Sequence, residues 1–269
     1  MQYKACVFGN PVEQSKSPFI HETFAKQCDV DFEYVKQSPE IKDFLNSASE
    51  FLSAAQVVGA NITVPFKEQA FSFVDELSLQ AKRAGAVNTF IKKDGKVIGE
   101  NTDGIGLVQD LRRNGVILKD ARVLLIGAGG AAKGALPALI DADVGAVQIY
   151  NRTENRAKDL VEYAESYCAE KLSLYDGVSK YDLIINATTL SLSAKLPALP
   201  DSIYANSPVC YDMVYLNKPT VFMTHAESLG CLCIDGLGML VGQAAESFYY
   251  WFDKRPDVEP VLRLLRSAL

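Results

Sequence analysis

The sequence predicts an α/β protein of two domains, and three observations support this prediction. Short apolar segments that fit buried strands alternate with segments of helical spacing along most of the chain. An Asp94-Gly95 pair inside residues 88–101 gives the strongest short-range signal for a β-hairpin. Residues 121–142 run from an apolar strand through a glycine-rich turn into a helix, which is how a doubly wound sheet begins.

The predicted elements form two blocks and a tail. Residues 1–103 hold strands at 4–9, 32–37 and 57–64, helices at 17–28 and 68–77, and the hairpin. Residues 104–237 begin with an amphipathic helix and continue with apolar strands, expected at 121–127, 146–150, 181–188, 208–215 and 231–236. Residues 238–269 have the pattern of two helices, which we expect to pack back on the first domain. A ligand is expected in the cleft between the domains.

Composition and charge exclude several classes of function. The 269 residues carry a net charge of −6, which argues against nonspecific binding to nucleic acid or to an anionic membrane. No run of about eighteen apolar residues predicts a membrane span, and residues 1–10 lack the pattern of a signal peptide. The six cysteines form no CxxC pair, so neither a disulfide framework nor a metal site is expected. We therefore expect a cytoplasmic protein whose partner is a small molecule.

The glycine turn predicts a dinucleotide site. Gly127, Gly129 and Ala132 form a G-x-G-x-x-A pattern that follows the strand "VLLI" and opens a helix. The first glycine allows a tight turn, the second lets the backbone approach a pyrophosphate, and the small third residue packs helix against strand. The alternative is a purely structural turn. The context of strand and helix favours a Rossmann-like, dinucleotide-binding domain over residues 104–237.

Residues 149–156, "IYNRTENR", indicate which dinucleotide binds. After the second strand an NAD-binding fold places an acidic residue for the ribose 2′-hydroxyl, whereas this chain has Asn151, Arg152, Thr153 and Arg156. Guanidinium groups attract a 2′-phosphate, and each charge-assisted hydrogen bond contributes roughly 1.5–3 kcal/mol. The alternative is that both arginines are a solvated helix end beside Glu154. Their place after the second strand favours NADP.

Hydride transfer to a ketone also requires a proton donor. The two histidines, His21 and His225, have no partner that the sequence identifies, and we interpret both as structural. Lys67 follows a strand end at Pro65, and Asp103 precedes the helix that enters the second domain. A lone lysine is usually a surface residue and an aspartate before a helix is usually an N-cap, so the two are only candidates on these grounds.

Nine stretches, matching in order and spacing, resemble the shikimate dehydrogenase family along nearly the whole chain. They are "FGNPVEQSKSPFIH", "GANITVPFKE", "AGAVNT", "NTDGIGL", "IGAGGAAKG", "YNRT", "INAT", "YDMVY" and "DGLGMLVGQAA". The resemblance implies a reversible, NADPH-dependent reduction of 3-dehydroshikimate to shikimate, in the biosynthesis of chorismate and aromatic amino acids. It also implies that residues 1–103, with 238–269, form the substrate-binding and catalytic domain.

The resemblance also implies a role for individual residues. Lys67 is the expected general acid and base, with Asp103 as its partner. The substrate would be bound at its carboxylate and its ring hydroxyls by polar side chains, namely Ser15, Ser17, Thr63, Asn88, Tyr215 and Gln243. The pyrophosphate would meet Gly127, Ala128, Gly129, Gly130 and Ala131, and the adenosine phosphate Asn151, Arg152, Thr153 and Arg156. Met213 and Gly236 would lie near the nicotinamide, and Thr188 would also contact the cofactor.

The chain departs from the family pattern at two places. Gln14 stands where a histidine is common, and it keeps the capacity to hydrogen-bond. After "NAT" the family usually has a small residue and then a glycine, as in NAT-S-x-G, whereas this chain has Thr189, Leu190 and Ser191. Loss of that glycine can shift the loop beside the cofactor without changing the reaction.

Two alternative functions remain open on the sequence. One is a quinate/shikimate dehydrogenase that uses NAD, against which Arg152, Thr153 and Arg156 argue. The other is a regulator that binds NADPH without catalysis, since a fold does not fix a function. A binding module would not need the proton donor that Lys67 provides. The sequence leaves the choice between monomer and homodimer open.

Overall fold

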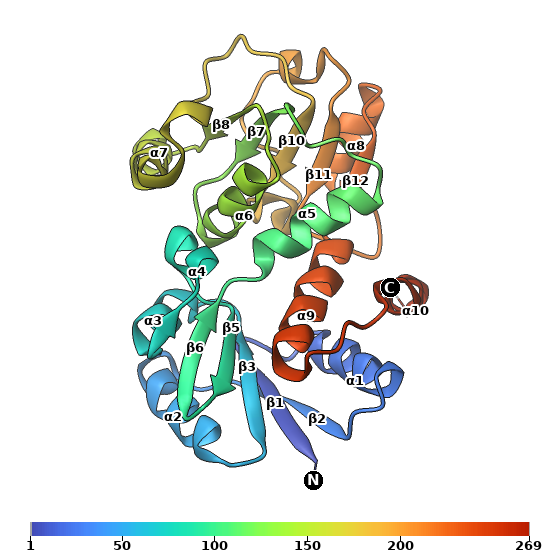
Figure 1. Cartoon of the computed structure of the whole chain (residues 1–269). Helices are drawn as coiled ribbons and strands as arrows, with labels where there is room; N and C mark the ends of the chain where they lie inside the picture. Colours follow the sequence, from blue (N-terminus) through green and yellow to red (C-terminus); the bar gives the residue numbers. More distant parts are fainter. Residues whose placement is uncertain (1, 269) are drawn as a thin grey trace. The chain divides into compact units, whose positions relative to one another are not determined.

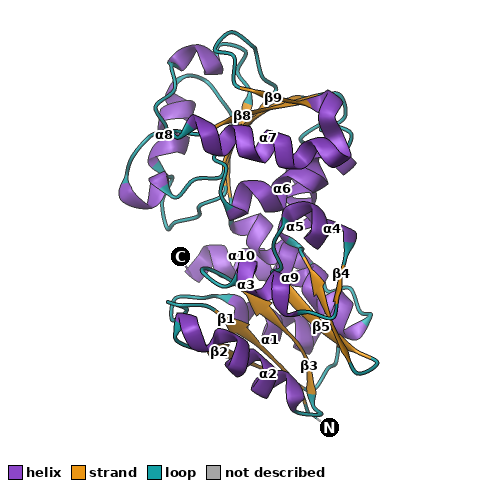
Figure 2. Cartoon of the chain, turned by 90° about the vertical axis from the view of Figure 1, so that its left-hand side faces the viewer, coloured by secondary structure: helices purple, strands orange, loops and turns teal. Residues whose placement is uncertain are grey.

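A computed structural model describes residues 2–268, apart from the side chain of Ala169 (Figure 1). The chain divides into two compact units. The first unit comprises the residues up to Gly106 together with Val241–Ala268, and the second unit spans Leu107–Leu240. Both boundaries fall inside helices, α5 (Asp103–Arg113) and α9 (Leu237–Phe252). In each unit a six-stranded sheet is accompanied by helices (Figure 2), so the predicted α/β fold is confirmed.

The first unit contains a mixed sheet in the order β2-β1-β3-β5-β6-β4. Its strands are β1 (Tyr3–Phe8), β2 (Phe32–Gln37), β3 (Val57–Ile62), β4 (Glu76–Leu77), β5 (Thr89–Lys93) and β6 (Lys96–Glu100). Strand β1 runs parallel to β2 and β3, whereas β5 runs antiparallel to β3 and β6. The hairpin turns at Asp94 and Gly95, which both have positive φ (51° and 78°), as the Asp-Gly signal predicts.

Four helices precede α5 in the first unit, and the tail adds two. They are α1 (Ser17–Gln27), α2 (Phe44–Ser53), α3 (Lys67–Phe73) and α4 (Leu79–Ala84), followed at the tail by α9 and α10 (Val258–Ala268). Phe248 and Trp251 of α9 pack against His21 of α1, and the Trp251 indole donates a 2.9 Å hydrogen bond to the Phe90 carbonyl. The tail therefore completes the core of the first unit.

The second unit contains an all-parallel sheet in the order β12-β11-β10-β7-β8-β9. Its strands are β7 (Arg122–Ile126), β8 (Ala146–Tyr150), β9 (Leu172–Leu174), β10 (Leu183–Asn186), β11 (Val209–Asp212) and β12 (Cys233–Asp235). The helices α6 (Gly130–Asp141), α7 (Glu154–Cys168) and α8 (Val221–Ser228) connect strands. Chain order reverses between β7 and β10, the place where doubly wound sheets bind ligands.

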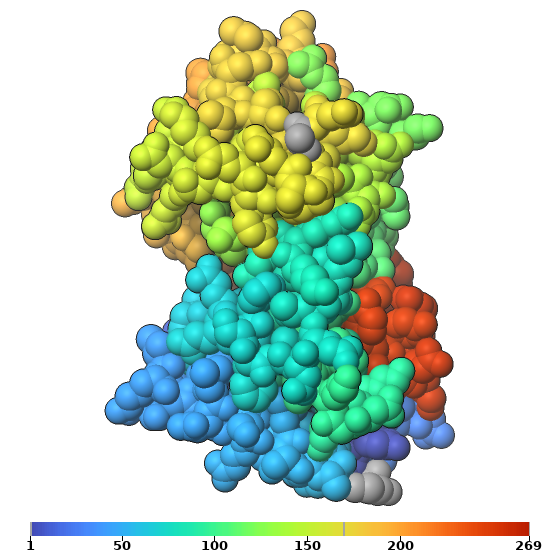
Figure 3. Space-filling view, turned by 60° about the vertical axis from the view of Figure 1, so that its left-hand side comes forward, coloured from blue at the N-terminus to red at the C-terminus, as the bar shows by residue number. Residues whose placement is uncertain are grey.

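Three helices, α2, α4 and α8, and two short strands, β4 and β9, were not expected from the sequence, and the helix expected at 68–77 ends at Phe73, before β4. Helix α2 contains three serines and one asparagine, but Phe44, Ala48 and Leu52 recur at every fourth position and form its buried face. The short strands have two and three residues, too few for a periodic signal. In the space-filling view of Figure 3, segments between residues 150 and 200 (yellow) form much of the visible face of the second unit.

Candidate active site

The topology of the first unit brings several predicted site residues to one edge of its sheet. Strands β1, β3 and β6 end at this edge and the antiparallel β5 begins there, because the pairings place Phe8, Ile62, Thr89 and Glu100 at matching ends. The residues that follow or precede these ends are Ser15, Ser17, Thr63, Lys67, Asn88 and Asp103. Backbone hydrogen bonds from Ile62 to Asn88 and from Asn88 to Glu100 hold the edge together.

Lys67 and Asp103 form an ion pair at this edge. The Lys67 Nζ lies 2.5 Å from Asp103 Oδ2, and the two side chains are 22% and 11% exposed. Lys67 begins α3 and Asp103 begins α5, so each side chain is fixed by the start of a helix. Asp103 is the first helical residue, and its own amide donates to Asn101 Oδ1 at 3.2 Å. The pair remains accessible, as a group that exchanges a proton with a ligand must be.

Asn88 holds the second oxygen of the Asp103 carboxylate. Its Nδ2 donates to Asp103 Oδ1 at 2.8 Å and to Thr102 Oγ1 at 3.0 Å. Because an amide nitrogen carries two hydrogens, both donors of Asn88 are used inside the unit. Asn88 therefore orients Asp103 in this structure, and it would have to release one partner to donate to a ligand.

A buried polar network lies beneath the ion pair. Its centre is Asn61 of β3, whose Nδ2 donates to Ser247 Oγ (2.9 Å) and Thr89 Oγ1 (3.1 Å). Thr89 Oγ1 donates to Asn88 Oδ1 at 2.9 Å, which links the network to Asp103. The sequence analysis did not identify Asn61, Thr89 or Ser247. All three side chains are less than one-tenth exposed. The signal that the sequence offered was a polar residue inside an apolar strand or helix, because buried polar groups need hydrogen-bond partners.

His21 is completely buried at the other end of this network. Its Nε2 lies 3.0 Å from Asn61 Oδ1, which also accepts from the Tyr34 hydroxyl at 2.8 Å. Because this oxygen can only accept, Nε2 carries the hydrogen, and the buried Nδ1 has no hydrogen-bond partner. Burial lowers the pKa of His21 from 6.5 to about 3, against a smaller opposing effect of Asn61. His21 is thus a neutral residue of the core.

The remaining predicted substrate residues lie in two places. Ser15 Oγ donates to Ser17 Oγ at 3.1 Å and accepts from the Ser17 amide at 3.2 Å, so the two hydroxyls lie side by side. Gln243 lies on α9 in the first unit, and its carbonyl accepts from Ser247. Tyr215 belongs to the second unit, where burial raises the pKa of its hydroxyl.

The glycine turn of the second unit has the conformation that the motif predicts. Gly127 has a φ of +115°, and its amide donates to the Tyr150 carbonyl at 2.7 Å. A Cβ at Gly127 would lie 3.2 Å from the Ala187 carbonyl oxygen, so this position requires glycine. Gly129 and Gly130 face open space, and Gly130 begins α6. Free backbone at a helix N-terminus is suited to bind phosphate.

The two arginines after β8 are exposed. Asn151 Nδ2 donates to the Thr153 carbonyl at 2.8 Å and so shapes the turn between β8 and α7. Glu154, the neighbour that could have neutralised an arginine, pairs instead with Lys158 at 2.7 Å. Within residues 2–268 neither Arg152 nor Arg156 forms an ion pair, and both guanidinium groups are accessible to an anion.

Three further predicted residues follow strands of the second unit. Thr188 follows β10, Met213 follows β11 and Gly236 follows β12, which are neighbouring parallel strands. A Cβ on Gly236 would meet the Met213 carbonyl oxygen at 2.1 Å, so the two loops touch. The carboxyl ends of these strands and the glycine turn therefore share one edge of the sheet.

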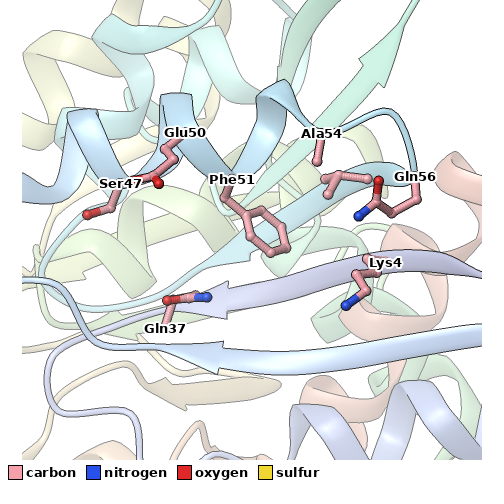
Figure 4. A pocket seen from close by; sticks show the side chains of 8 residues that line it. Lys4, Gln37, Ser47, Glu50, Phe51, Ala54 and Gln56 are labelled. Atoms are coloured by element: carbon pink, nitrogen blue, oxygen red, sulfur yellow. The ribbon is translucent and has the colours of Figure 1, made fainter.

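One cavity of the first unit lies outside the group of predicted site residues. A cavity of about 440 Å³ lies in the first unit between α2 and the strands (Figure 4), and it is lined by Lys4, Gln37, Ser47, Glu50, Phe51, Ala54, Gln56 and Val57, none of them a predicted site residue. Among the described residues no group of three His, Cys, Asp or Glu side chains could hold a metal ion. The cysteines are all free. No helix within residues 2–268 is long and apolar enough to cross a membrane.

Comparison with known proteins identifies the family. The family model described as the shikimate dehydrogenase substrate binding domain matches residues 7–90. The models described as shikimate / quinate 5-dehydrogenase and shikimate 5'-dehydrogenase C-terminal domain match residues 110–195 and 236–266. The shikimate dehydrogenase (NADP(+)) of Colwellia psychrerythraea is 48% identical over all of this chain and 97% of its own. This chain belongs to the shikimate dehydrogenase family.

Other members of the family agree with this assignment. The shikimate dehydrogenase (NADP(+)) of Shewanella halifaxensis is 49% identical over 100% of this chain and 97% of its own. Among solved structures, the shikimate 5-dehydrogenase of Thermus thermophilus, in complex with NADP(H) and shikimate, superposes with a TM-score of 0.89. It is 30% identical, and the match covers 100% of both chains.

Proposed function

We propose that this protein catalyses the reversible, NADPH-dependent reduction of 3-dehydroshikimate to shikimate in aromatic amino acid biosynthesis. It is an oxidoreductase of the shikimate dehydrogenase family. The observation that carries the proposal is the accessible Lys67–Asp103 pair, fixed by two helix starts and by Asn88. A proton donor so held is needed for reduction of a ketone and has no purpose in a binding module.

The second unit fits NADPH. Gly129 and Gly130 leave open space at the N-terminus of α6, where pyrophosphate oxygens can accept backbone hydrogen bonds. Arg152 and Arg156 are exposed where a 2′-phosphate would lie, and no acidic residue stands at Asn151. When bound, the nicotinamide supplies the hydride that reduces the carbonyl carbon.

Lys67 would supply the proton. As the carbonyl oxygen gains charge, the Lys67 ammonium donates one proton to it, and in the oxidation direction the neutral amine takes that proton back. Asp103 accepts a hydrogen bond from Lys67 and orients it. Because Asn88 holds Asp103 Oδ1, only Oδ2 is left to face the lysine and the substrate hydroxyl.

The other polar side chains would bind the substrate. The Ser15 and Ser17 hydroxyls, side by side, are suited to a carboxylate, and Tyr215 would add a third donor. Thr63, Gln243 and Asn88 would pair ring hydroxyls, Asn88 by releasing Thr102 while it keeps Asp103, and such pairing makes the site discriminate strongly against analogues lacking the hydroxyls. In this proposal the first unit binds substrate and the second binds the dinucleotide. We also place the protein in the cytoplasm, where its six cysteines would stay free.

The test is turnover of 3-dehydroshikimate with NADPH and, in parallel, with NADH. We expect fast consumption of NADPH and little consumption of NADH. Comparable rates with both would move the assignment to a quinate/shikimate type, and NADPH binding without turnover would reject catalysis.

A lysine variant tests the assigned proton donor. Lys67→Ala should lower kcat by roughly 10²–10⁴ with little change in NADPH affinity. The matched control is Lys93→Ala, because Lys93 is an exposed residue of the β5–β6 hairpin in the same unit. A near-normal kcat for Lys67→Ala would refute the role.

A further inference from the structure

A buried carboxylate lies at the carboxyl end of β11, directly before Met213. Asp212 is fully buried, and within residues 2–268 no lysine or arginine forms an ion pair with it. Four neutral donors satisfy its oxygens. Asn186 Nδ2 (3.2 Å) and the Val214 amide (3.1 Å) donate to Oδ1, and the hydroxyls of Ser191 and Thr220 donate to Oδ2 at 2.6 Å each.

Hydrogen bonds lead from this carboxylate to the glycine turn. Asn186, which donates to Asp212, accepts at its Oδ1 from the Thr188 hydroxyl (2.7 Å) and the Thr188 amide (3.2 Å). Thr188 Cγ2 and the Ala187 carbonyl oxygen then lie 3.2 Å from the position that a Cβ of Gly127 would take. The segment after β10 therefore abuts the turn at which the dinucleotide is proposed to bind.

Ser191 is the buried anchor of this segment. Residues Leu190–Ser193 form a short 3₁₀ helix, of which Ser191 is the buried member, at 3% exposure. Leu192 is 62% exposed and Ser193 is exposed, so apolar packing of this helix is limited to Leu190, which is partly buried. The hydroxyl–carboxylate hydrogen bond of Ser191 is thus the buried polar contact that holds this segment, beside the partly buried Leu190.

We propose that Ser191 is a positioning residue for the cofactor. Its hydrogen bond to Asp212 fixes residues 187–191 against the glycine turn, at the place where the chain lacks the glycine of the NAT-S-x-G pattern. Thr220 makes an equivalent bond to the same oxygen but is the N-cap of α8, outside this segment. The two hydroxyls therefore support the carboxylate equally and differ in what they position. This inference rests on the proposed function, because it requires that NADPH bind at the turn.

The test compares Ser191→Ala, Thr220→Ala and the exposed Ser193→Ala by NADPH fluorescence titration and by steady-state kinetics. Losing one charge-assisted hydrogen bond predicts a roughly tenfold rise in the NADPH Kd and KM for Ser191→Ala. In the same assay we expect the KM for 3-dehydroshikimate to stay within about twofold. The NADPH Kd and KM of Thr220→Ala and Ser193→Ala should also stay within about twofold, since a tenfold change corresponds to about 1.4 kcal/mol.

Several outcomes would overturn the proposal. An unchanged NADPH Kd for Ser191→Ala would overturn it. An equal rise in the NADPH Kd of Thr220→Ala would also overturn it, because the effect would then come from the Asp212 carboxylate and not from the Ser191 segment. An equal rise in both KM values would indicate general damage. If Ser191→Ala does not fold, Ser191→Thr and Ser191→Val form a second pair of equal shape, and only the valine variant should lose affinity. A wild-type protein that does not bind NADPH would instead reject the proposed function itself.

Discussion

Acid should destabilise the first unit through His21, by an amount that the structure allows us to work out. The folded pKa of about 3 lies below the ordinary value of 6.5. Below pH 6.5 the unfolded chain therefore binds a proton that the folded chain excludes, and stability falls as pH decreases until about pH 3. At about 1.4 kcal/mol per pH unit, the loss is about 2 kcal/mol at pH 5 and approaches about 5 kcal/mol near pH 3. At neutral pH the effect is absent.

The assay is urea unfolding between pH 7.5 and 5, followed by the fluorescence of the only tryptophan. Trp251 reports on the correct region, because its ring centroid lies 5.1 Å from that of His21. His21→Gln keeps a donor for Asn61 and cannot titrate, so its stability should fall less steeply with acid than that of the wild type. The difference between the two curves removes the contribution of all other groups. Parallel curves would refute the reasoning.

Three further changes have defined outcomes. Arg152→Ala should weaken NADPH binding by roughly tenfold or more and NADH binding much less, because one charge-assisted bond to a 2′-phosphate is lost. Equal losses of affinity for the two cofactors in binding titrations would show that the arginine does not contact that phosphate. Ala194 has a φ of +52° after the 3₁₀ helix, so Ala194→Gly should raise stability in urea melts by about 1 kcal/mol, and a decrease would contradict the strain. Burial raises the pKa of the Glu100 carboxyl. The stability of the wild type relative to that of Glu100→Gln should therefore fall as pH rises above the ordinary carboxyl range. A constant difference in unfolding free energy between the two proteins across pH 4–7 would exclude this effect.

The sequence was sufficient where a short stretch has a local physical meaning. The turn at Gly127 needs a positive φ, the hairpin turns at Asp94-Gly95, and residues 151–153 after β8 lack a carboxylate. Each of these features can be recognised from a few consecutive residues. The Lys67–Asp103 pair, 36 residues apart, could be suspected only through the family resemblance. Sheet pairing is what brings these two residues together, and local patterns do not encode it.

Long-range polar contacts could not be predicted. Asn61 and Ser247 are 186 positions apart, and each sits in a stretch whose periodicity indicates only a strand or a helix. The Ser191–Asp212 bond joins the segment after β10 to the last residue of the adjacent β11, so it depends on strand order. Recognising that residues 189–191 depart from the family pattern was possible from the sequence. The consequence, a hydroxyl anchored on a buried carboxylate, required the structure.

Two glycines show how one substitution can separate stability from function. A Cβ at Gly59 would lie 2.1 Å from the Phe90 carbonyl oxygen and 2.3 Å from Trp251 Nε1, the two atoms joined by the bond that ties α9 to β5. Gly59→Ala should therefore destabilise the protein by roughly 2–4 kcal/mol, combining overpacking with a lost hydrogen bond, and should change Trp251 emission.

Gly129→Ala is the matched change at a position that faces open space. Its methyl group would meet no protein atom, so urea melts should be close to the wild type, within about 1 kcal/mol. In the proposed function that space receives the pyrophosphate, and the NADPH Kd should rise by tenfold or more, roughly 1.4 kcal/mol per factor of ten. If Gly129→Ala bound NADPH normally, the dinucleotide would not approach this turn. If Gly59→Ala melted like the wild type, the close approach of Trp251 to β3 would be wrong.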